Sequence, residues 1–311
     1  VISQLPDRKA SIPFRIMTEK CMRYGLLEMS LAENMVLRSE IVSVMGAQSN
    51  KNPIVDISNY ILLELGQPTH AFDKDKVDGE IRIELSDAAE EIEALDGKKY
   101  IVPAASIVIR DRKRTIAVAG VIGCANSMVG PGTRSVVVES ASSDPICNRK
   151  TARAMGISTD ASYLYERGCD TEMLVFALKR MAMLCAGSPG VMSTAAAHLV
   201  GFSYPENEAI EKRQVSLSLK SLRAQMNLAR LEESIILSRL KNLGYGVKQT
   251  EKEVFTMSVP SWRLWDVRNE ADVIEDFARS HSFSSIKLVL PPLDEEEPPL
   301  NDIEILRECL E

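Results

Sequence analysis

Two residues of this 311-residue chain have the type and the setting of groups that act on a bound ligand. His70 is one of only three histidines, and it follows Gly-Gln-Pro-Thr, where a strand or helix must stop and turn. Glu139 ends the apolar run of residues 136–138, where a carboxylate is costly unless a partner such as a ligand hydroxyl satisfies it. A histidine in a turn and a glutamate at a strand end are also common as purely structural residues.

Small residues are the second sign of a ligand site, because glycine and alanine let a ligand approach the backbone closely. Gly120 and Gly123 lie in the run Val-Ala-Gly-Val-Ile-Gly-Cys, residues 118–124. Ala161 lies in Thr-Asp-Ala-Ser, residues 159–162, and supplies the same kind of room. Residues 159–162 could instead simply cap the helix that follows them.

Acidic residues near the end of the chain could bind Mg²⁺. Asp272, Glu275 and Asp276 are spaced i, i+3 and i+4, so a helix places all three on one face. Oxygen-rich clusters of this kind suit Mg²⁺. The alternative is a solvated acidic face at a helix N-terminus, which the helix dipole favours.

These candidates must be positioned by secondary structure, and the sequence predicts an α+β fold with a mixed sheet over residues 1–205. From residue 54 to about 157, short apolar runs separated by Gly, Pro and Asp predict strands, and Asp96-Gly97 predicts a hairpin turn. Helical patterns flank this region. The predicted helices are residues 14–24, 31–45 and 172–186, and the predicted strands are 81–85, 106–110, 117–121 and 135–139.

A second, smaller domain is predicted over residues 212–286, after a linker at residues 204–208. Its pattern of two helices, a hairpin and a third helix is typical of a helix-rich, winged-helix-like module. Residues 287–311, rich in Pro and Glu at their start, predict a linker and the beginning of a truncated further domain. The three helices are predicted at residues 217–227, 232–243 and 270–280, and the hairpin strands at 247–251 and 254–259.

Composition excludes several classes of protein. Hydrophobic residues at 45% and charged residues at 26% indicate a globular protein, and no apolar run approaches the ~18 residues of a membrane helix. We therefore expect a cytoplasmic protein with no membrane partner. The six cysteines form no CxxC pair, which argues against a zinc site or a disulfide framework. The net charge of −7 requires any RNA contact to be local or assisted by a partner chain. Lysines and arginines do not line either helix of the second domain densely, so DNA binding is not predicted.

Three motifs, in this order and spacing, resemble the editing domain of the beta subunit of bacterial-type phenylalanyl-tRNA synthetase. They are Gly-Gln-Pro-Thr-His-Ala-Phe-Asp at residues 66–73, Glu-Ser-Ala at 139–141 and Thr-Asp-Ala-Ser at 159–162. Farther along, Pro-Ser-Trp-Arg at residues 260–263 and the acidic helix after it resemble the next domain of that subunit. The resemblance covers nearly the whole chain.

The resemblance implies a pocket that hydrolyses tyrosine wrongly attached to tRNA(Phe). Glu139 would read the tyrosine hydroxyl, and Gly123 and Ala161 would shape the pocket. His70 and Thr159 would orient water and the tRNA end, with no covalent nucleophile; a general-base role for His70 is the weaker alternative. A site built to bond a hydroxyl rejects the analogue that lacks it by roughly 10⁴-fold, so phenylalanyl-tRNA would be spared.

The resemblance also implies the setting of this pocket. The complete enzyme would charge tRNA(Phe) with phenylalanine, using ATP and Mg²⁺, as an α2β2 heterotetramer with an alpha subunit. ATP would be used by the complete enzyme and not bound by this segment, which alone would not aminoacylate. The Mg²⁺ ligands would be Asp266, Asp272, Glu275 and Asp276, although one extra residue before Asp266 departs from the family pattern.

Two other functions stay open from the sequence. The chain could be a non-catalytic scaffold that positions tRNA and assembles subunits around an inert pocket, which its acidic charge favours. Cys124 favours this alternative too, because it replaces a glycine of the family motif and puts a thiol near the expected pocket. A free-standing factor that edits in trans is the third alternative, and the downstream domain argues against it.

Overall fold

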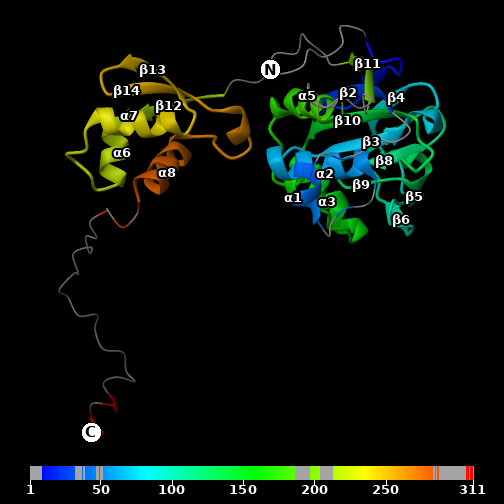
Figure 1. The fold of residues 1–311 in the computed structure, drawn as a ribbon. Helices are drawn as coiled ribbons and strands as arrows, with labels where there is room; N and C mark the ends of the chain where they lie inside the picture. Colours follow the sequence, from blue (N-terminus) through cyan, green and yellow to red (C-terminus); the bar gives the residue numbers. More distant parts are fainter. Residues whose placement is uncertain are drawn as a thin grey trace. The chain divides into compact units, whose positions relative to one another are not determined.

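The computed structural model describes residues 9–31, 37, 39–46, 49, 52–185, 197–203, 213–282, 284, 286, 306–307 and 309–310 (Figure 1). They form two compact units. The first contains the chain up to Gln214 together with Ser258–Arg268, and the second contains Val215–Met257 and the chain from Asn269 onward. The linker predicted at residues 204–208 lies outside the described residues, and so does most of the segment 287–311.

An antiparallel four-stranded sheet is the centre of the first unit. Its strands follow the order β11 (Ala197–Ser203), β2 (Cys21–Leu31), β10 (Ser135–Ser143) and β3 (Thr69–Asp73). The strands β2 and β10 are buried along almost their whole length, because both faces of the sheet are covered. A strand buried on both faces has a continuous apolar sequence rather than an alternating one, which explains residues 136–138.

Helices α2 (Pro53–Leu65) and α5 (Met173–Cys185) cover one face of this sheet (Figure 1). Asn52 caps the N-terminus of α2, Pro53 occupies its first turn, and Gly66 ends it in the left-handed conformation. The shorter helix α1 (Ser39–Met45) packs against α2. The core between helices and sheet includes Leu27, Met29, Val136, Val138, Ile57, Ile61, Leu178 and Met181.

A five-stranded sheet covers the other face. Its strands follow the order β1 (Phe14–Ile16), β4 (Ile81–Leu85), β7 (Ile107–Arg110), β8 (Thr115–Val118) and β9 (Ile122–Gly123). The pair β1 and β4 is parallel and the other pairs are antiparallel, so the predicted mixed sheet is confirmed. The buried layer that the two sheets share includes Leu26, Phe72, Ile83, Ile109 and Val137.

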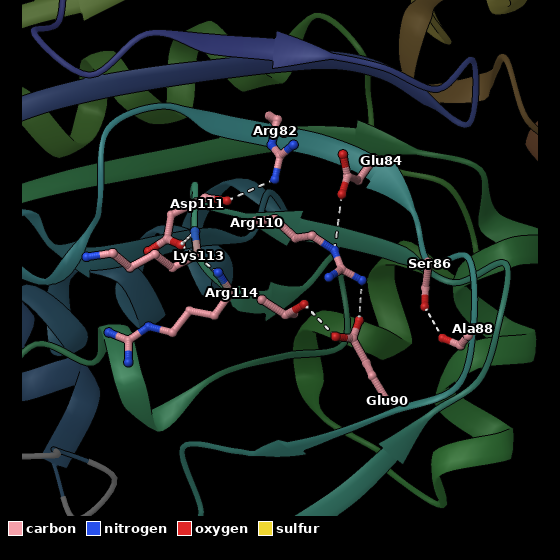
Figure 2. A network of polar contacts seen from close by, with 10 residues as sticks. Arg82, Glu84, Ser86, Ala88, Glu90, Arg110, Asp111, Lys113 and Arg114 are labelled. Carbon is pink, nitrogen blue, oxygen red and sulfur yellow. Dashed lines mark hydrogen bonds and ion pairs between the residues drawn. The ribbon is translucent and has the colours of Figure 1, made fainter.

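The second face of the five-stranded sheet is covered by a hairpin, β5 (Glu90–Glu93) and β6 (Lys99–Val102), and by α3 (Pro145–Met155), on which α4 (Asp160–Tyr165) packs. The predicted turn at Asp96-Gly97 joins the hairpin strands. Figure 2 shows how the hairpin is held: Arg110 pairs with Glu84 at 3.1 Å and with Glu90 at 2.7 Å. These half-buried ion pairs tie β5 to β4 and β7.

The second unit is a three-stranded sheet with three helices. Its sheet order is β12 (Gln214–Ser218), β14 (Val254–Ser258) and β13 (Gly246–Glu251), and its helices are α6 (Leu219–Gln225), α7 (Glu233–Asn242) and α8 (Glu270–His281). All three predicted helices and the predicted hairpin are confirmed, and β12 is an additional strand. The α+β fold class is therefore confirmed. In the described part of the chain, no helix is both long and apolar enough to cross a membrane.

Several predicted elements of the first unit are wrong. Residues 14–24 form β1 and the start of β2, because pairing of β1 with β4 and of β2 with β10 overrides the local helical pattern. Of the predicted helix at residues 31–45, only α1 is helical; residue 31 ends β2, and residues 32–36 lie outside the described residues. The helices α2 and α3 lie in the region predicted as strands, whereas the helix predicted at 172–186 is confirmed as α5.

Candidate functional site

A cavity of about 540 Å³ opens in the first unit where the edge strand β3 meets β8, β9 and the start of α4. Cavities that bind small molecules span about 300–1,000 Å³, so this one has the volume of a ligand site. We call it the His70 cavity. All six residues that the sequence predicts for the pocket line it, namely His70, Gly120, Gly123, Glu139, Thr159 and Ala161.

Glu139 and His70 are direct neighbours across the antiparallel pair of β10 and β3. Directly opposite residues of such a pair have their side chains on the same face of the sheet. Their face is the one that also carries Val137 and Phe72 in the layer between the two sheets. The strand register therefore places a carboxyl group and an imidazole in the same part of the cavity wall.

The Glu139 carboxyl is buried, with only 8% of the residue exposed. Burial raises the pKa of this carboxyl to about 8, against the opposing effect of the Tyr24 hydroxyl. Its Oε2 atom has no hydrogen-bond partner among the described residues. At neutral pH the group is therefore mostly protonated, and it can both donate and accept a hydrogen bond toward a ligand.

The His70 imidazole is partly buried in the cavity wall. Its ring meets the edge of Phe72 in a T-shaped contact with centroids 4.7 Å apart. Burial lowers the pKa of His70 to about 4, so the ring is neutral at neutral pH. Within the described residues its Nε2 atom has no hydrogen-bond partner. The cavity thus presents two uncharged groups whose hydrogen-bonding capacity the protein leaves unused.

Gly123 is the residue that makes room beside the imidazole. A Cβ atom at this position would lie 2.5 Å from Cε1 and 2.6 Å from Nε2 of His70. Gly120 has a different requirement, because its φ of +66° is a conformation that favours glycine and a Cβ would lie 2.7 Å from the Tyr165 ring. Both predicted glycines are therefore needed for the shape of the cavity wall.

Thr159 is the N-cap of α4. Its hydroxyl accepts a hydrogen bond from the Ser162 backbone N–H at 3.0 Å, and the Ser162 hydroxyl accepts one from the Thr159 N–H at 2.8 Å. The same Thr159 hydroxyl donates to the Val121 carbonyl at 3.0 Å. The capping alternative is therefore confirmed, and the cap also fixes Ala161 in the cavity wall.

Cys124 does not line the His70 cavity. Its side chain is fully buried in the core under the five-stranded sheet, beside Val118 and Ala152. Burial raises the pKa of the Cys124 thiol to about 12, so it is neither ionised nor accessible at neutral pH. The sequence suggests that Cys124 favours an inert pocket, but a thiol outside the cavity gives that alternative no support. The thiol does not supply a nucleophile either.

Three polar residues that no sequence pattern marked as site residues also build the site. The buried Gln67 donates from Nε2 to the Ser140 hydroxyl at 3.1 Å and to the Ala141 carbonyl at 2.9 Å, which anchors the turn before His70 to β10. Tyr165 donates to the same Ala141 carbonyl at 3.1 Å. The signal for Gln67 was present, because it belongs to the motif that contains His70. The third residue is Tyr24, and nothing local in the sequence marks it.

One side of α2 forms another wall of the cavity. Asn52, Val55, Asn59 and Leu62 line it, and their spacing places them along one face of the helix. Ser58, in the same stretch, donates to the Thr69 carbonyl at 2.6 Å and so fixes the helix to β3. This wall combines two apolar side chains with two amide groups, and polar groups placed among apolar ones fix the orientation of a ligand in such sites.

The acidic residues predicted to bind Mg²⁺ are used by the protein itself. Asp272 accepts a hydrogen bond from the Asn269 backbone N–H at 2.9 Å as part of a capping box at the start of α8. Asp276 is buried and accepts a hydrogen bond from the Tyr245 hydroxyl at 2.6 Å. This geometry supports the alternative in which the acidic residues stabilise the N-terminus of α8 through the helix dipole.

The other two predicted ligands do not complete a cluster. Asp266 pairs with Arg263 at 2.6 Å, and Glu275 is exposed on α8. Over the residues that the structure describes, no group of three or more His, Cys, Asp or Glu side chains could hold a metal ion. This arrangement does not fit a Mg²⁺ site, and the metal stays a prediction from the sequence.

The comparisons with known proteins agree with the motifs. A sequence model of the B3/4 domain matches residues 35–187, and one of the tRNA synthetase B5 domain matches residues 215–283. Phenylalanine–tRNA ligase beta subunits from Carboxydothermus hydrogenoformans and Gloeobacter violaceus are 39% and 37% identical over 77% and 78% of this chain. This chain belongs to the family of phenylalanyl-tRNA synthetase beta subunits.

The match places the His70 cavity within the B3/4 domain and α8 within the B5 domain. The chain spans about a third or less of its relatives, covering 29% of the Carboxydothermus hydrogenoformans subunit and 30% of the Gloeobacter violaceus subunit. A solved N-terminal fragment of the phenylalanyl-tRNA synthetase beta subunit from Pyrococcus horikoshii aligns with 89% of this chain and 77% of that fragment, at 12% identity and a TM-score of 0.41.

Proposed function

We propose that the His70 cavity hydrolyses the ester between tyrosine and a wrongly charged tRNA(Phe). The observation that carries this proposal is the Glu139 carboxyl, which is buried in the cavity wall with an unpaired Oε2 atom among the described residues. An unpaired buried polar atom costs about 1–3 kcal/mol in a protein. A ligand that satisfies this atom recovers the cost, and an analogue that cannot satisfy it does not.

Tyrosine and phenylalanine differ by one hydroxyl, and this difference is the kind that Glu139 can read. A phenol can donate to the ionised carboxylate of Glu139, and it can donate to or accept from the protonated carboxyl. A phenylalanine ring in the same place would leave the carboxyl unpaired and shut it off from water. A site of this kind discriminates by roughly 10⁴-fold, which is sufficient to destroy tyrosyl-tRNA and spare phenylalanyl-tRNA.

Hydrolysis of the ester needs an oriented water and a path for its proton. A water oxygen bonds to the ester carbonyl carbon, the bond from that carbon to the ribose oxygen breaks, and the water proton passes to the ribose oxygen that leaves. The His70 Nε2 atom can hold this water by a hydrogen bond. With a pKa of about 4, His70 is a weak base at neutral pH, so its role is orientation rather than proton abstraction.

The rest of the cavity suits the end of a tRNA. The α2 wall, with Val55, Asn59 and Leu62, extends the cavity beyond the group formed by His70 and Glu139. Asparagine side chains pair with the polar edge of adenine, and apolar neighbours pack on its ring. The terminal adenosine that carries the amino acid would lie along this wall.

The setting of the site in a complete enzyme is part of the same proposal. The relatives are beta subunits of phenylalanine–tRNA ligase, and family membership supports an alpha subunit and tRNA(Phe) as partners in an α2β2 assembly. ATP and Mg²⁺ would serve aminoacylation in that assembly and not hydrolysis in this cavity. The net charge of −7 fits an RNA contact that is confined to the cavity or shared with a partner chain.

The test is deacylation of Tyr-tRNA(Phe) and Phe-tRNA(Phe) by this chain, and by the complete synthetase that contains it. The proposal expects release of tyrosine and little release of phenylalanine. The matched control is Glu93→Gln, an exposed glutamate on the hairpin that should leave both rates unchanged. Equal rates for both esters, from a folded sample, would contradict the proposal.

The rival function is an inert scaffold that positions tRNA. Its support is the use of the Thr159 hydroxyl inside the protein, which removes one of the three predicted catalytic groups from contact with a substrate. Under this alternative, neither the chain nor the complete synthetase cleaves either ester at a rate that depends on His70 or Glu139. Activity in the complete synthetase alone would instead show that the cavity needs a partner.

A further inference from the structure

A small second cavity lies behind Glu139. It measures about 10 Å³ and is lined by Glu139, Tyr24, Cys21, Tyr165 and Ser143, among others. A hollow of this size holds one water at most. Glu139 lines both this cavity and the His70 cavity, so its carboxyl has a substrate side and an internal side.

The strand register places Tyr24 next to Glu139. On the paired strands β10 and β2, Glu139 lies opposite Leu26 and Ala141 lies opposite Tyr24. Tyr24 is therefore the diagonal neighbour of Glu139 on the same face of the sheet, a spacing that an aromatic side chain can reach across. No loop or flexible segment is involved, because both residues lie in the two central strands.

The Tyr24 hydroxyl has an unused proton. The residue is fully buried, and its hydroxyl has no hydrogen-bond partner among the described residues. Burial, followed by the proximity of the Glu139 carboxylate, raises the pKa of the Tyr24 phenol well above its ordinary value, so it stays protonated. Tyr24 and Glu139 are thus a buried donor and a buried acceptor that share one small hollow, each without another partner in the described structure.

The other groups around Glu139 cannot replace this donor. Tyr165 directs its hydroxyl to the Ala141 carbonyl at 3.1 Å, and Cys21 directs its thiol to the Arg23 carbonyl at 3.5 Å. The remaining titratable groups of the two cavity walls are His70, whose burial keeps it neutral at neutral pH, and Asp160, which is exposed at the start of α4. Neither Lys nor Arg lines either cavity in the described part of the chain.

We propose that Tyr24 is a positioning residue for Glu139: its buried hydroxyl donates to the carboxyl from behind, across the small cavity, and so fixes the oxygen that faces the substrate. The inference rests on the proposed function for its consequence in editing, but not for the contact itself. A donor on the internal side stabilises the ionised carboxyl and holds its plane, so one oxygen is presented to the ligand hydroxyl.

The test measures the Glu139 carboxyl directly. The chain is labelled with ¹³C at the glutamate carboxyl carbons, and the Glu139 signal is assigned as the one that Glu139→Gln removes. Tyr24→Phe removes the hydroxyl alone, and we expect the titration midpoint of Glu139 to rise by about one pH unit. Tyr100→Phe is the matched control, because its hydroxyl donates to Asp96 at 2.8 Å and Tyr100 lines neither cavity; the Glu139 midpoint should then stay at the parent value.

A second substitution at Tyr24 should move the Glu139 midpoint in the opposite direction, so the test does not depend on Tyr24→Phe folding. Replacing Tyr24 by 3-fluorotyrosine keeps the side chain nearly the same size and makes its hydroxyl a stronger donor, so the Glu139 midpoint should fall. A purely structural role for Tyr24 would lower thermal stability without moving the midpoint in either direction. Unmoved midpoints in the fluorotyrosine protein and in a folded Tyr24→Phe protein would overturn the inference.

Activity separates this inference from the proposed function. In a chain or synthetase that edits, Tyr24→Phe should lower the ratio of tyrosyl to phenylalanyl ester hydrolysis about tenfold, and Tyr100→Phe should not. A midpoint that moves in a protein without hydrolysis would uphold the Tyr24 contact and refute the editing function. Selective hydrolysis with an unmoved Glu139 midpoint would uphold the editing function and refute the Tyr24 contact.

Discussion

Glu139 on β10 lies directly opposite His70 on the edge strand β3, and both side chains enter one cavity. Burial shifts the pKa values of the two groups in opposite directions, to about 8 for the carboxyl and about 4 for the imidazole. Both are therefore mostly uncharged near pH 7. A pocket with two neutral groups whose hydrogen-bonding capacity is unused favours an aromatic ligand that carries a hydroxyl.

The contribution of Glu139 to the stability of the first unit should fall as the pH rises from about 4.5 to about 8, and the lowered pKa of His70 should offset part of this fall below about pH 6.5. In this window the unfolded chain ionises Glu139 while the folded chain keeps it protonated, because the folded pKa is raised. Glu139→Gln removes the titrating carboxyl and should make the free energy of unfolding less dependent on pH. At pH 9 the loss of stability relative to pH 5 should be smaller in the variant than in the parent by on the order of a few kcal/mol. Urea unfolding at pH 5, 7 and 9, followed by hydrogen exchange in β10, measures it.

Glu93→Gln is the control for that titration, because this glutamate is exposed on the β5 strand. Its pH dependence should follow that of the parent protein. If Glu139→Gln and the parent lost stability in parallel between pH 5 and pH 9, the carboxyl would not be protonated in the folded protein.

Gly123→Ala should abolish hydrolysis and leave the fold intact. The added methyl group would lie within 2.6 Å of the His70 imidazole, so the ring must leave the position that orients water. Gly132→Ala is the matched control, because a Cβ at that exposed glycine meets no atom within 4 Å. Deacylation rates and circular dichroism of both variants decide the matter; parent-level activity in Gly123→Ala would refute this role for the glycine.

Thr159→Ser should retain both stability and hydrolysis, whereas Thr159→Val should lose part of each. Serine keeps the hydroxyl that accepts from Ser162 and donates to Val121, and valine removes it. Loss of a helix N-cap costs about 1–2 kcal/mol, and the freed α4 would displace Ala161 from the cavity wall. Urea unfolding and deacylation test this. Full loss of hydrolysis with unchanged stability in Thr159→Val would point to direct contact with substrate instead.

Millimolar Mg²⁺ should leave the unfolding of the second unit unchanged. The carboxylates predicted as ligands are committed to the α8 cap and to the Tyr245 hydroxyl. Tyr245→Phe should lower stability by about 1–3 kcal/mol with or without the metal, because it leaves the buried Asp276 short of a donor. Thermal unfolding with and without Mg²⁺ checks this. Stabilisation by Mg²⁺ that Asp272→Asn removes would restore the predicted metal site.

The residues of the site were predictable from the sequence because they lie in short contiguous motifs. Each motif brings its own geometry: Gly66 and Gln67 end α2 and anchor the turn into β3, and Thr159 caps α4. The cavity then follows from the pairing of β10 with β3. The small residues Gly120 and Gly123 were predicted because glycine lets a ligand approach the backbone. The structure adds that a Cβ at either position would collide with a neighbouring side chain.

The secondary structure was less predictable where apolar runs are continuous. The start of β2 has the composition of an amphipathic helix, and only burial on both faces makes it a strand. For α2 the signals were present, with Asn52 and Pro53 at its start and Gly66 at its end, but the apolar run between them is also typical of a buried strand. Tyr24 was out of reach, because its relation to Glu139 depends on pairing between strands more than 100 residues apart.

The most direct measurement is the ratio of the hydrolysis rates of Tyr-tRNA(Phe) and Phe-tRNA(Phe), for the parent and for Glu139→Ala, in the complete synthetase. The account predicts a high ratio for the parent, on the order of 10⁴, and a collapse toward one in the variant, because the hydroxyl of tyrosine loses its buried partner. A parent ratio that survives Glu139→Ala in a folded enzyme would contradict the claim that Glu139 reads the substrate in this cavity.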